Sequence, residues 1–289
     1  MRRMMAAMPA LILDGKIAAA AVLTELRPAI RDLDPQLVVV QVGDDPASAS
    51  YIRQKMQSCK QVGMRHRHEH LPADTSADTL FRLIESLNAD DDVTGFILQL
   101  PLPAHLQESV PLFLRSIEPA KDMDGFTAYN LGKVFLSTEY EHLPPATPAG
   151  VLLLLDHYHI PVQGKHAVIV GHSNIVGKPL SVMLLNRNAT VTTCHIYTQD
   201  LAAHTRMADI LCVAVGKPGL ITADMVKHDA VVVDIGITRT DAGLKGDVDF
   251  GAVQEKAAAI TPVPGGVGPM TVASLIRNCV HAAQRQRSS

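Results

Sequence analysis

Short, continuously apolar segments alternate with amphipathic segments along this sequence, and that alternation restricts the fold more than any other feature. Residues 37–42 and 94–100 are apolar along most of their length, as parallel strands buried on both faces are. Residues 46–61 and 75–87 have the spacing of helices. Strands that alternate with helices form βαβ units and a mostly parallel sheet, so the sequence predicts an α/β protein.

The alternating series occurs twice, on either side of the proline-rich segment His142-Leu-Pro-Pro-Ala-Thr-Pro148. The second series predicts a Rossmann-like, doubly wound nucleotide-binding domain at residues 148–262. Residues 9–147 and 263–289 would form an N-terminal three-layer α/β catalytic domain, to which a C-terminal helix at 271–284 returns. In the second series we expect strands at 167–170, 190–194, 210–214 and 230–235, and helices at 151–157, 178–188, 200–207 and 222–227.

Composition excludes several functional classes. A chain of 289 residues has room for about two domains. Its net charge of −3, without a long basic run, predicts neither a nucleic-acid nor a membrane-surface partner. Four widely spaced cysteines without a CxxC pair suit a reducing cytoplasm, and thirteen histidines without an HExxH motif predict no metal. We expect the first eight residues, which only weakly resemble a signal peptide, to be an extension before a start at Met8.

Residues 262–269 contain three glycines and three prolines. Proline fixes φ, and glycine lets a ligand approach the backbone closely. Such a stiff wall without bulky side chains suits a flat ligand. A rigid connector between two elements is the alternative interpretation.

The loop Gly171-His-Ser-Asn-Ile-Val-Gly-Lys-Pro179 follows the first predicted strand of the second domain. Open α/β sheets bind dinucleotides at such a loop, with phosphate at the helix N-terminus. A plain strand-to-helix turn with Ser173 as the cap remains an alternative. His195, at the end of the next strand, would line the same crevice or serve a structural role.

Four side chains in the first domain could carry chemistry. Tyr51 and Lys55 are four residues apart on a predicted helix and share one face. Gln99 ends a buried strand, where it could donate to a carbonyl or to the lysine amine. In Lys121-Asp-Met-Asp-Gly125, one carboxylate could accept two N–H donors from a heterocycle. A surface pair and a solvated turn are the alternatives.

Taken together, these motifs resemble the bifunctional methylenetetrahydrofolate dehydrogenase/methenyltetrahydrofolate cyclohydrolase family. The matching segments occur in the family's order and span about residues 11–278. They are Val42-Gly-Asp-Asp-Pro-Ala-Ser48, Tyr51 with Lys55, Gln99-Leu-Pro-Leu-Pro103, Lys121-Asp-Met-Asp-Gly-Phe126, Gly171-x-Ser-x-x-Val-Gly-x-Pro179, Asp234-Ile-Gly-Ile237 and Pro262-Val-Pro-Gly-Gly-Val-Gly-Pro-Met-Thr271.

The resemblance implies a homodimer that oxidises 5,10-methylenetetrahydrofolate with NADP and hydrolyses the methenyl product to 10-formyltetrahydrofolate. It implies that Lys55 is the catalytic lysine, that Gln99 tunes it, and that Asp124 binds the pterin ring. The implied folate site, in a cleft between the domains, comprises Ser48, Tyr51, Lys55, Leu98, Gln99, Leu100, Asp124, Pro264, Gly265, Gly266, Val267 and Gly268. The implied cofactor site comprises Gly171, His172, Ser173, Val176, Gly177, His195, Ile196, Gly216 and Ile237.

Two residues depart from the family pattern at the cofactor's 2′-phosphate. His172 stands where the family usually has arginine, and Ile196 where serine is frequent. Arginine is always charged, whereas histidine is mostly neutral near pH 7, so the NADP preference should be weaker or pH-dependent and NAD becomes possible.

Two other functions remain open: a dehydrogenase without the hydrolase, and a non-catalytic nucleotide-binding protein. The intact Lys55 and Gln99 argue against the first, and the retained Tyr51, Lys55, Gln99 and Asp124 argue against the second. A protonated amine would repel the cationic methenyl group, so we expect Lys55 to be neutral when substrate binds.

Overall fold

The structure is a computed structural model that describes residues 10–241 and 243–288, so the expectation for residues 1–8 lies outside the described part. Its residues group into two compact units: residues 20–146 with 272–288, here the catalytic unit, and residues 10–19 with 147–271, here the nucleotide unit. Among the described residues, no helix is both long and apolar enough to cross a membrane.

The catalytic unit is built on a three-stranded parallel sheet in the order β3-β2-β4. Its strands are β2 (Gln36–Val42), β3 (Arg65–Leu71) and β4 (Gly95–Leu98). Side chains of β2 alternate between two cores: Leu37 and Val39 belong to one, Val38 and Val40 to the other.

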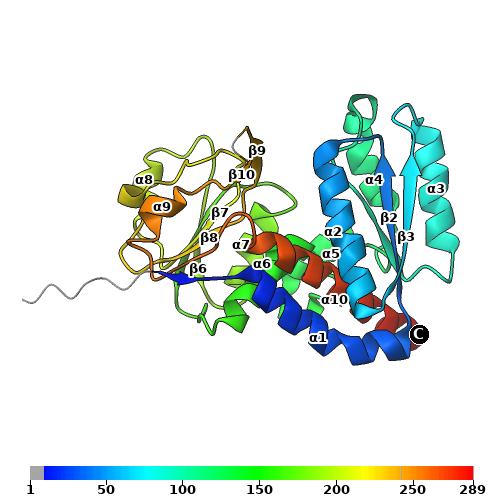
Figure 1. The fold of residues 1–289 in the computed structure, drawn as a ribbon, viewed down its shortest axis with the longest axis horizontal. Coiled ribbons are helices and arrows are strands. Elements are labelled where there is room, and N and C mark those ends of the chain that lie inside the picture. Colours follow the sequence, from blue (N-terminus) through cyan, green and yellow to red (C-terminus); the bar gives the residue numbers. More distant parts are fainter. Residues whose placement is uncertain (1–9, 242, 289) are drawn as a thin grey trace, which may run out of the picture. The chain divides into compact units, whose positions relative to one another are not determined.

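Helices cover both faces of this sheet, which confirms the predicted three layers (Figure 1). One core includes residues of α1 (Gly15–Leu33) and α2 (Pro46–Val62), and the other includes residues of α3 (Ala77–Ala89) and α4 (Val110–Ser116). The unit also contains α5 (Ala128–Leu136) and the short 3-10 turns Ala104–Ser109 and Thr138–Tyr140.

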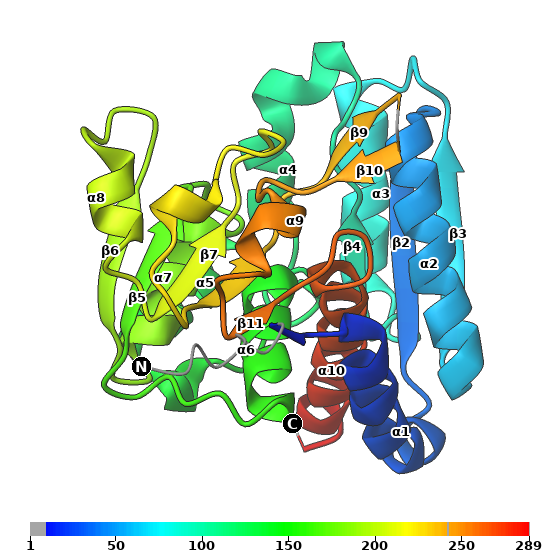
Figure 2. The ribbon, with the colours of Figure 1, turned by 60° about the vertical axis from the view of Figure 1, so that its left-hand side comes forward.

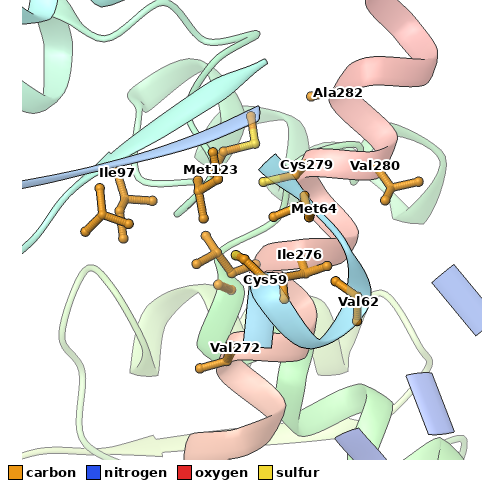
Figure 3. Close-up of a cluster of buried hydrophobic side chains, with 14 of the residues drawn as sticks. Cys59, Val62, Met64, Ile97, Met123, Val272, Ile276, Cys279, Val280 and Ala282 are labelled. Atoms are coloured by element: carbon orange, nitrogen blue, oxygen red, sulfur yellow. The ribbon is translucent and has the colours of Figure 1, made fainter. Parts of the chain in front are cut away.

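The C-terminal helix α10 (Val267–Ser288) packs on the catalytic unit, as predicted. Figure 3 shows Val272, Ile276 and Cys279 of this helix among Cys59 and Met64. The helix begins four residues earlier than expected, inside the proline–glycine segment. Pro269 falls in its first turn, where a helix needs no backbone N–H.

The nucleotide unit contains a six-stranded sheet in the order β1-β11-β8-β7-β5-β6, parallel throughout. The strand order reverses at β5, which lies between β6 and β7, as the doubly wound prediction requires. The strands are β5 (His166–Val170), β6 (Thr190–Cys194), β7 (Ile210–Val213), β8 (Val231–Asp234) and β11 (Ala259–Ile260), and the helices are α6 (Ala146–His157), α7 (Gly177–Leu185), α8 (Leu201–Thr205) and α9 (Phe250–Val253).

The compact units differ from the expected domain boundaries at both ends of the catalytic domain. Strand β1 (Leu11–Ile12) pairs with β11 and so joins the sheet of the nucleotide unit (Figure 2). Residues 263–271 also group with that unit. The reason is local: Gly15 N donates to Gly265 O at 2.9 Å, so the start of the chain is held against the proline–glycine segment.

Two other expectations in the nucleotide unit need correction. The helix expected at 222–227 is only a 3-10 turn, Ala223–Met225. A small antiparallel pair, β9 (Thr238–Thr240) with β10 (Gly243–Lys245), follows β8 and was not expected. Three-residue strands are too short for periodicity to reveal.

Candidate active site

Lys55 lies in the middle of α2, and its position depends on both ends of that helix. The Asp45 side chain accepts from Ser48 N at 2.7 Å and caps the N-terminus, while Gly63 ends the helix at a φ of 76°. Lys55 is only 8% exposed, and its Nζ donates to Gln99 Oε1 at 3.1 Å. The helix therefore places this amine against the residue that follows β4.

Gln99 has a defined orientation because its amide makes two contacts of different kinds. Its Nε2 donates to Leu100 O at 2.8 Å, and a carbonyl oxygen can only accept. Oε1 must therefore face Lys55. Gln99 thus donates to a carbonyl, one of the two alternatives expected from the sequence, but it accepts from the lysine amine, so the other alternative, donation to that amine, is wrong.

The two carboxylates of the Lys121–Gly125 turn have different functions in the structure. Asp122 is buried and accepts from Gly125 N, Thr127 N and Asn130 Nδ2, so it is a structural residue. Asp124 is partly buried. Desolvation raises the pKa of its carboxyl above the ordinary value. A positive charge on Lys55 lowers this pKa, and the negative charge on Asp122 raises it further. Asp124 is therefore the carboxylate of this turn that a ligand could use.

Two side chains that sequence reasoning missed fix this turn. Asn278 of α10, 2% exposed, donates from Nδ2 to Met123 O and to Pro144 O, both at 2.9 Å. Lys121 Nζ donates to Leu87 O and Asp90 O at 3.0 and 2.6 Å, and so has a structural role. An asparagine on the apolar helix face that contains Leu275, Cys279 and Ala282 was the available signal for the first.

The other predicted folate residues of the catalytic unit lie on α2 or next to Gln99, and one of them has its side chain in the hydrophobic core. Tyr51 is one turn before Lys55 on α2, and burial raises the pKa of its phenol. Ser48 is buried, and its Oγ donates to Leu100 O at 3.5 Å. The Leu98 side chain, however, is part of the hydrophobic core, so a ligand could contact only its backbone.

In the nucleotide unit, the predicted phosphate loop connects β5 to α7 at the point where the strand order reverses. Gly171 has a φ of +119°, and a Cβ there would lie 2.3 Å from Ala214 O. Ser173 Oγ accepts from Val176 N at 3.2 Å and Gly177 N at 3.4 Å, so it holds the backbone at the start of α7, although the N-cap residue of that helix is Val176. The loop combines close backbone packing with an exposed rim, a form that suits a dinucleotide.

His172 of this loop lies next to His195, with ring centroids 5.0 Å apart. Tyr197 N donates to His195 Nδ1 at 3.2 Å, so a neutral His195 carries its proton on Nε2. Ile196 is 86% exposed and offers no hydrogen bond to a phosphate from its side chain. His172 is thus an ionisable side chain at the position where the family pattern has arginine, and His195 lies beside it, whereas the position of the family's serine holds the apolar Ile196.

The last two predicted cofactor residues follow the central strands of the sheet. Gly216 comes after β7, and its N–H donates to the buried carboxylate of Asp247. Ile237 comes after β8 and lines a small hollow with residues 264–268 of the proline–glycine segment. Within residues 10–241 and 243–288, no group of three or more His, Cys, Asp or Glu residues could hold a metal ion.

Comparison with known proteins agrees with this geometry. The family described as the catalytic domain of tetrahydrofolate dehydrogenase/cyclohydrolase matches residues 13–124, and the family described as its NAD(P)-binding domain matches residues 145–287. The Bifunctional protein FolD of Methanosarcina mazei is 51% identical over 280 residues, which cover 95% of this chain and 96% of that protein.

Two solved structures are similar over nearly the whole chain. The FolD methylenetetrahydrofolate dehydrogenase/cyclohydrolase of Campylobacter jejuni superposes with a TM-score of 0.90 at 45% identity and covers 95% of this chain and 98% of its own. The Trypanosoma brucei enzyme, solved with NADP cofactor and an inhibitor, gives a TM-score of 0.92 at 32% identity and covers 98% and 100%. This chain belongs to the tetrahydrofolate dehydrogenase/cyclohydrolase family.

Proposed function

We propose that this protein oxidises 5,10-methylenetetrahydrofolate to the methenyl form with NADP and then hydrolyses that form to 10-formyltetrahydrofolate. The hydrogen bond from buried Lys55 to Gln99 is the observation that carries this function. Family membership and the bifunctional relatives support it. A non-catalytic nucleotide-binding protein would have no need for a buried amine held in this way.

The nucleotide unit suits NADP. Gly171, Ser173, Val176 and Gly177 would hold the pyrophosphate at the start of α7, and Gly216 and Ile237 would lie along the nicotinamide half. His172, His195 and Ile196 would surround the 2′-phosphate. When bound, the nicotinamide accepts a hydride from the one-carbon bridge of the folate.

Lys55 would carry the proton transfer of the hydrolytic step. Methenyl cation and water give the 10-formyl product and one proton, so the reaction needs a group that takes a proton from the attacking water. A neutral Lys55 amine can do this, and Gln99 Oε1 orients it by accepting one of its N–H groups. Because the methenyl carbon is already electrophilic, positioning supplies much of the remaining catalysis.

The folate itself would be held by polar groups around this pair. An ionised Asp124 would accept two N–H donors from the pterin ring, and Tyr51 and Ser48 would help to place it. Leu100 would line the site, and Leu98 would contribute through its backbone. Pro264, Gly265, Gly266, Val267 and Gly268 remain predicted parts of the folate wall. A homodimer, a cytoplasmic location and the absence of nucleic-acid or membrane partners also remain predictions.

The test compares Lys55→Met with Lys60→Met, because Lys60 is exposed on the same helix. Lys55→Met should lose hydrolysis of added methenyltetrahydrofolate by about 10²–10⁴-fold, the range of general acid–base catalysis, and should still bind NADP. Lys60→Met should retain both activities. Hydrolysis by Lys55→Met at the wild-type rate would remove Lys55 from the mechanism.

The same assay separates the alternatives. The wild-type protein, given methylenetetrahydrofolate and NADP, should reduce the nucleotide without accumulating the methenyl form. Accumulation would indicate a dehydrogenase alone. No reduction of NADP or NAD would indicate a binding protein.

A further inference from the structure

Asp247 is a fully buried carboxylate that follows β10 in the nucleotide unit, and sequence reasoning gave it no function. Its Oδ2 accepts from Val215 N at 2.7 Å and from Gly216 N at 3.0 Å. Val215 and Gly216 belong to the loop that follows β7, at the carboxyl edge of the sheet. Asp247 therefore holds that loop through two backbone hydrogen bonds.

A second buried carboxylate holds Asp247. Asp234 ends β8, and its Oδ1 accepts from Asp247 N at 3.0 Å and from Gly236 N at 3.2 Å. Its Oδ2 accepts from Val248 N at 2.9 Å. Desolvation is the main reason that the pKa of Asp234 is raised, to about 6, against these hydrogen bonds. The two acids join the loops after β7, β8 and β10.

This arrangement is costly for a purely structural connection. Burying a carboxylate is unfavourable even when it is hydrogen-bonded, and Asp247 Oδ1 is buried without a hydrogen-bond partner among the described residues. The surrounding backbone is shaped to admit the acids. A Cβ on Gly236 would lie 2.1 Å from Asp247 Oδ2, and one on Gly246 would lie 2.0 Å from Asp234 Oδ2.

We propose that Asp247 is a positioning residue for the nicotinamide half of the cofactor, and that Asp234 holds Asp247 in place. The inference rests on the proposed function. The loops that contain Gly216 and Ile237 follow β7 and β8, beyond the reversal at β5, where the second half of a dinucleotide binds. Asp247 binds the first of these loops and packs against Gly236 of the second.

The contacts also determine what the loop after β7 offers to the cofactor. The N–H groups of Val215 and Gly216 are both used by Asp247, so they do not donate to the nucleotide. The loop presents its carbonyl oxygens and the small Cα face of Gly216 instead. Without Asp247, both N–H groups would lose their acceptor and the loop would change its conformation.

The test uses Asp247→Ala and Asp247→Asn. The alanine removes Oδ2, the oxygen that accepts from both N–H groups, so the Michaelis constant for NADP should rise at least about tenfold, equivalent to about 1.4 kcal/mol of binding energy. Asparagine has a side-chain oxygen that can accept from the same two N–H groups, and should keep the constant within about threefold of wild type. Hydrolysis of added methenyltetrahydrofolate needs no nucleotide and should change less than about twofold in either variant.

Val253→Ala is the matched control. Val253 is fully buried in the core of the same unit, but it lies on α9 and not in the loops that follow β7 and β8. It should lower thermal stability without raising the Michaelis constant for NADP. An unchanged constant in folded Asp247→Ala, or equal loss of both activities, would overturn the proposal.

If Asp247→Ala does not fold, Asp247→Ser is used in its place. Serine leaves a smaller cavity than alanine does, but its hydroxyl is shorter than the aspartate carboxylate and cannot bridge both N–H groups. Its constant should also rise, and an unchanged constant overturns the proposal. Failure of the proposed function is recognised separately, since the wild-type protein would then reduce neither NADP nor NAD.

Discussion

Asn278, close to the C-terminus, donates to the carbonyl oxygen of Met123 at 2.9 Å across 155 positions of the sequence. The same amide nitrogen donates to Pro144 O, so one side chain of α10 holds the turn next to Asp124 and the segment that leaves the catalytic unit. Asn278 thus supports the proposed folate site without belonging to it.

Replacing Asn278 with leucine should weaken both stability and folate binding. The Met123 carbonyl, which is buried, and the Pro144 carbonyl, which is partly buried, would lose their donor, which costs about 2–5 kcal/mol in the free energy of unfolding. The Michaelis constant for methylenetetrahydrofolate should rise while that for NADP stays the same. Gln284→Leu, at an exposed position of the same helix, should change neither constant. Equal changes in both constants would contradict a local role at the Asp124 turn.

The sequence could predict the two-domain fold because each βαβ unit leaves a local pattern. The buried strand Gln36–Val42 and the glycine that ends α2 are examples. What it could not predict are pairings between distant segments: β1 with β11, or Asn278 with the Asp124 turn. Nothing within a few residues of Leu11 or Asn278 identifies such partners.

The candidate site was predictable to the same extent. Lys55, Gln99 and Asp124 stand in motifs, and the structure brings Lys55 and Gln99 together as the resemblance implied. The direction of their hydrogen bond depends on Leu100 O, which no motif reveals. Asp247 was missed because its function depends on two backbone N–H groups more than thirty positions away.

The orientation of Gln99 leads to a prediction for Gln99→Glu. A carboxylate in place of Oε1 would form an ion pair with Lys55 and keep its amine protonated. Hydrolysis of methenyltetrahydrofolate should then fall by about 10²-fold or more, since the lysine could no longer accept a proton. Stopped-flow absorbance of the methenyl form would measure this. NADP binding should not change, and unimpaired hydrolysis would show that Lys55 acts without being neutral.

His172→Arg should restore a strong preference for NADP. An arginine beside His195 would give the 2′-phosphate a permanent charge and a bidentate donor. The ratio of kcat/KM for NADP to that for NAD should rise by about tenfold or more, mainly through KM. His228→Arg, at an exposed position of the same unit, is the control for added charge. If the ratio stays at the wild-type value, the phosphate does not bind beside His172.

Asp124 should make folate binding sensitive to pH. Accepting two N–H donors requires the ionised carboxylate, and desolvation raises the pKa of Asp124 above its ordinary value of 3.8. Folate binding is therefore complete at pH values above the raised pKa and is lost as the pH falls through it. The loss begins at a higher pH than it would if this carboxyl had the pKa of an exposed aspartate. The Michaelis constant for methylenetetrahydrofolate in the wild-type protein should therefore rise on acidification.

Asp124→Asn tests the assignment, because its amide does not titrate. The variant should bind folate more weakly than the wild type at pH values above the raised pKa, since one of the two acceptor oxygens is replaced by an amide donor. Its Michaelis constant for folate should lack the acidic rise of the wild type. If the rise persists unchanged in Asp124→Asn, another group is responsible for it, and the pterin ring does not depend on this carboxylate.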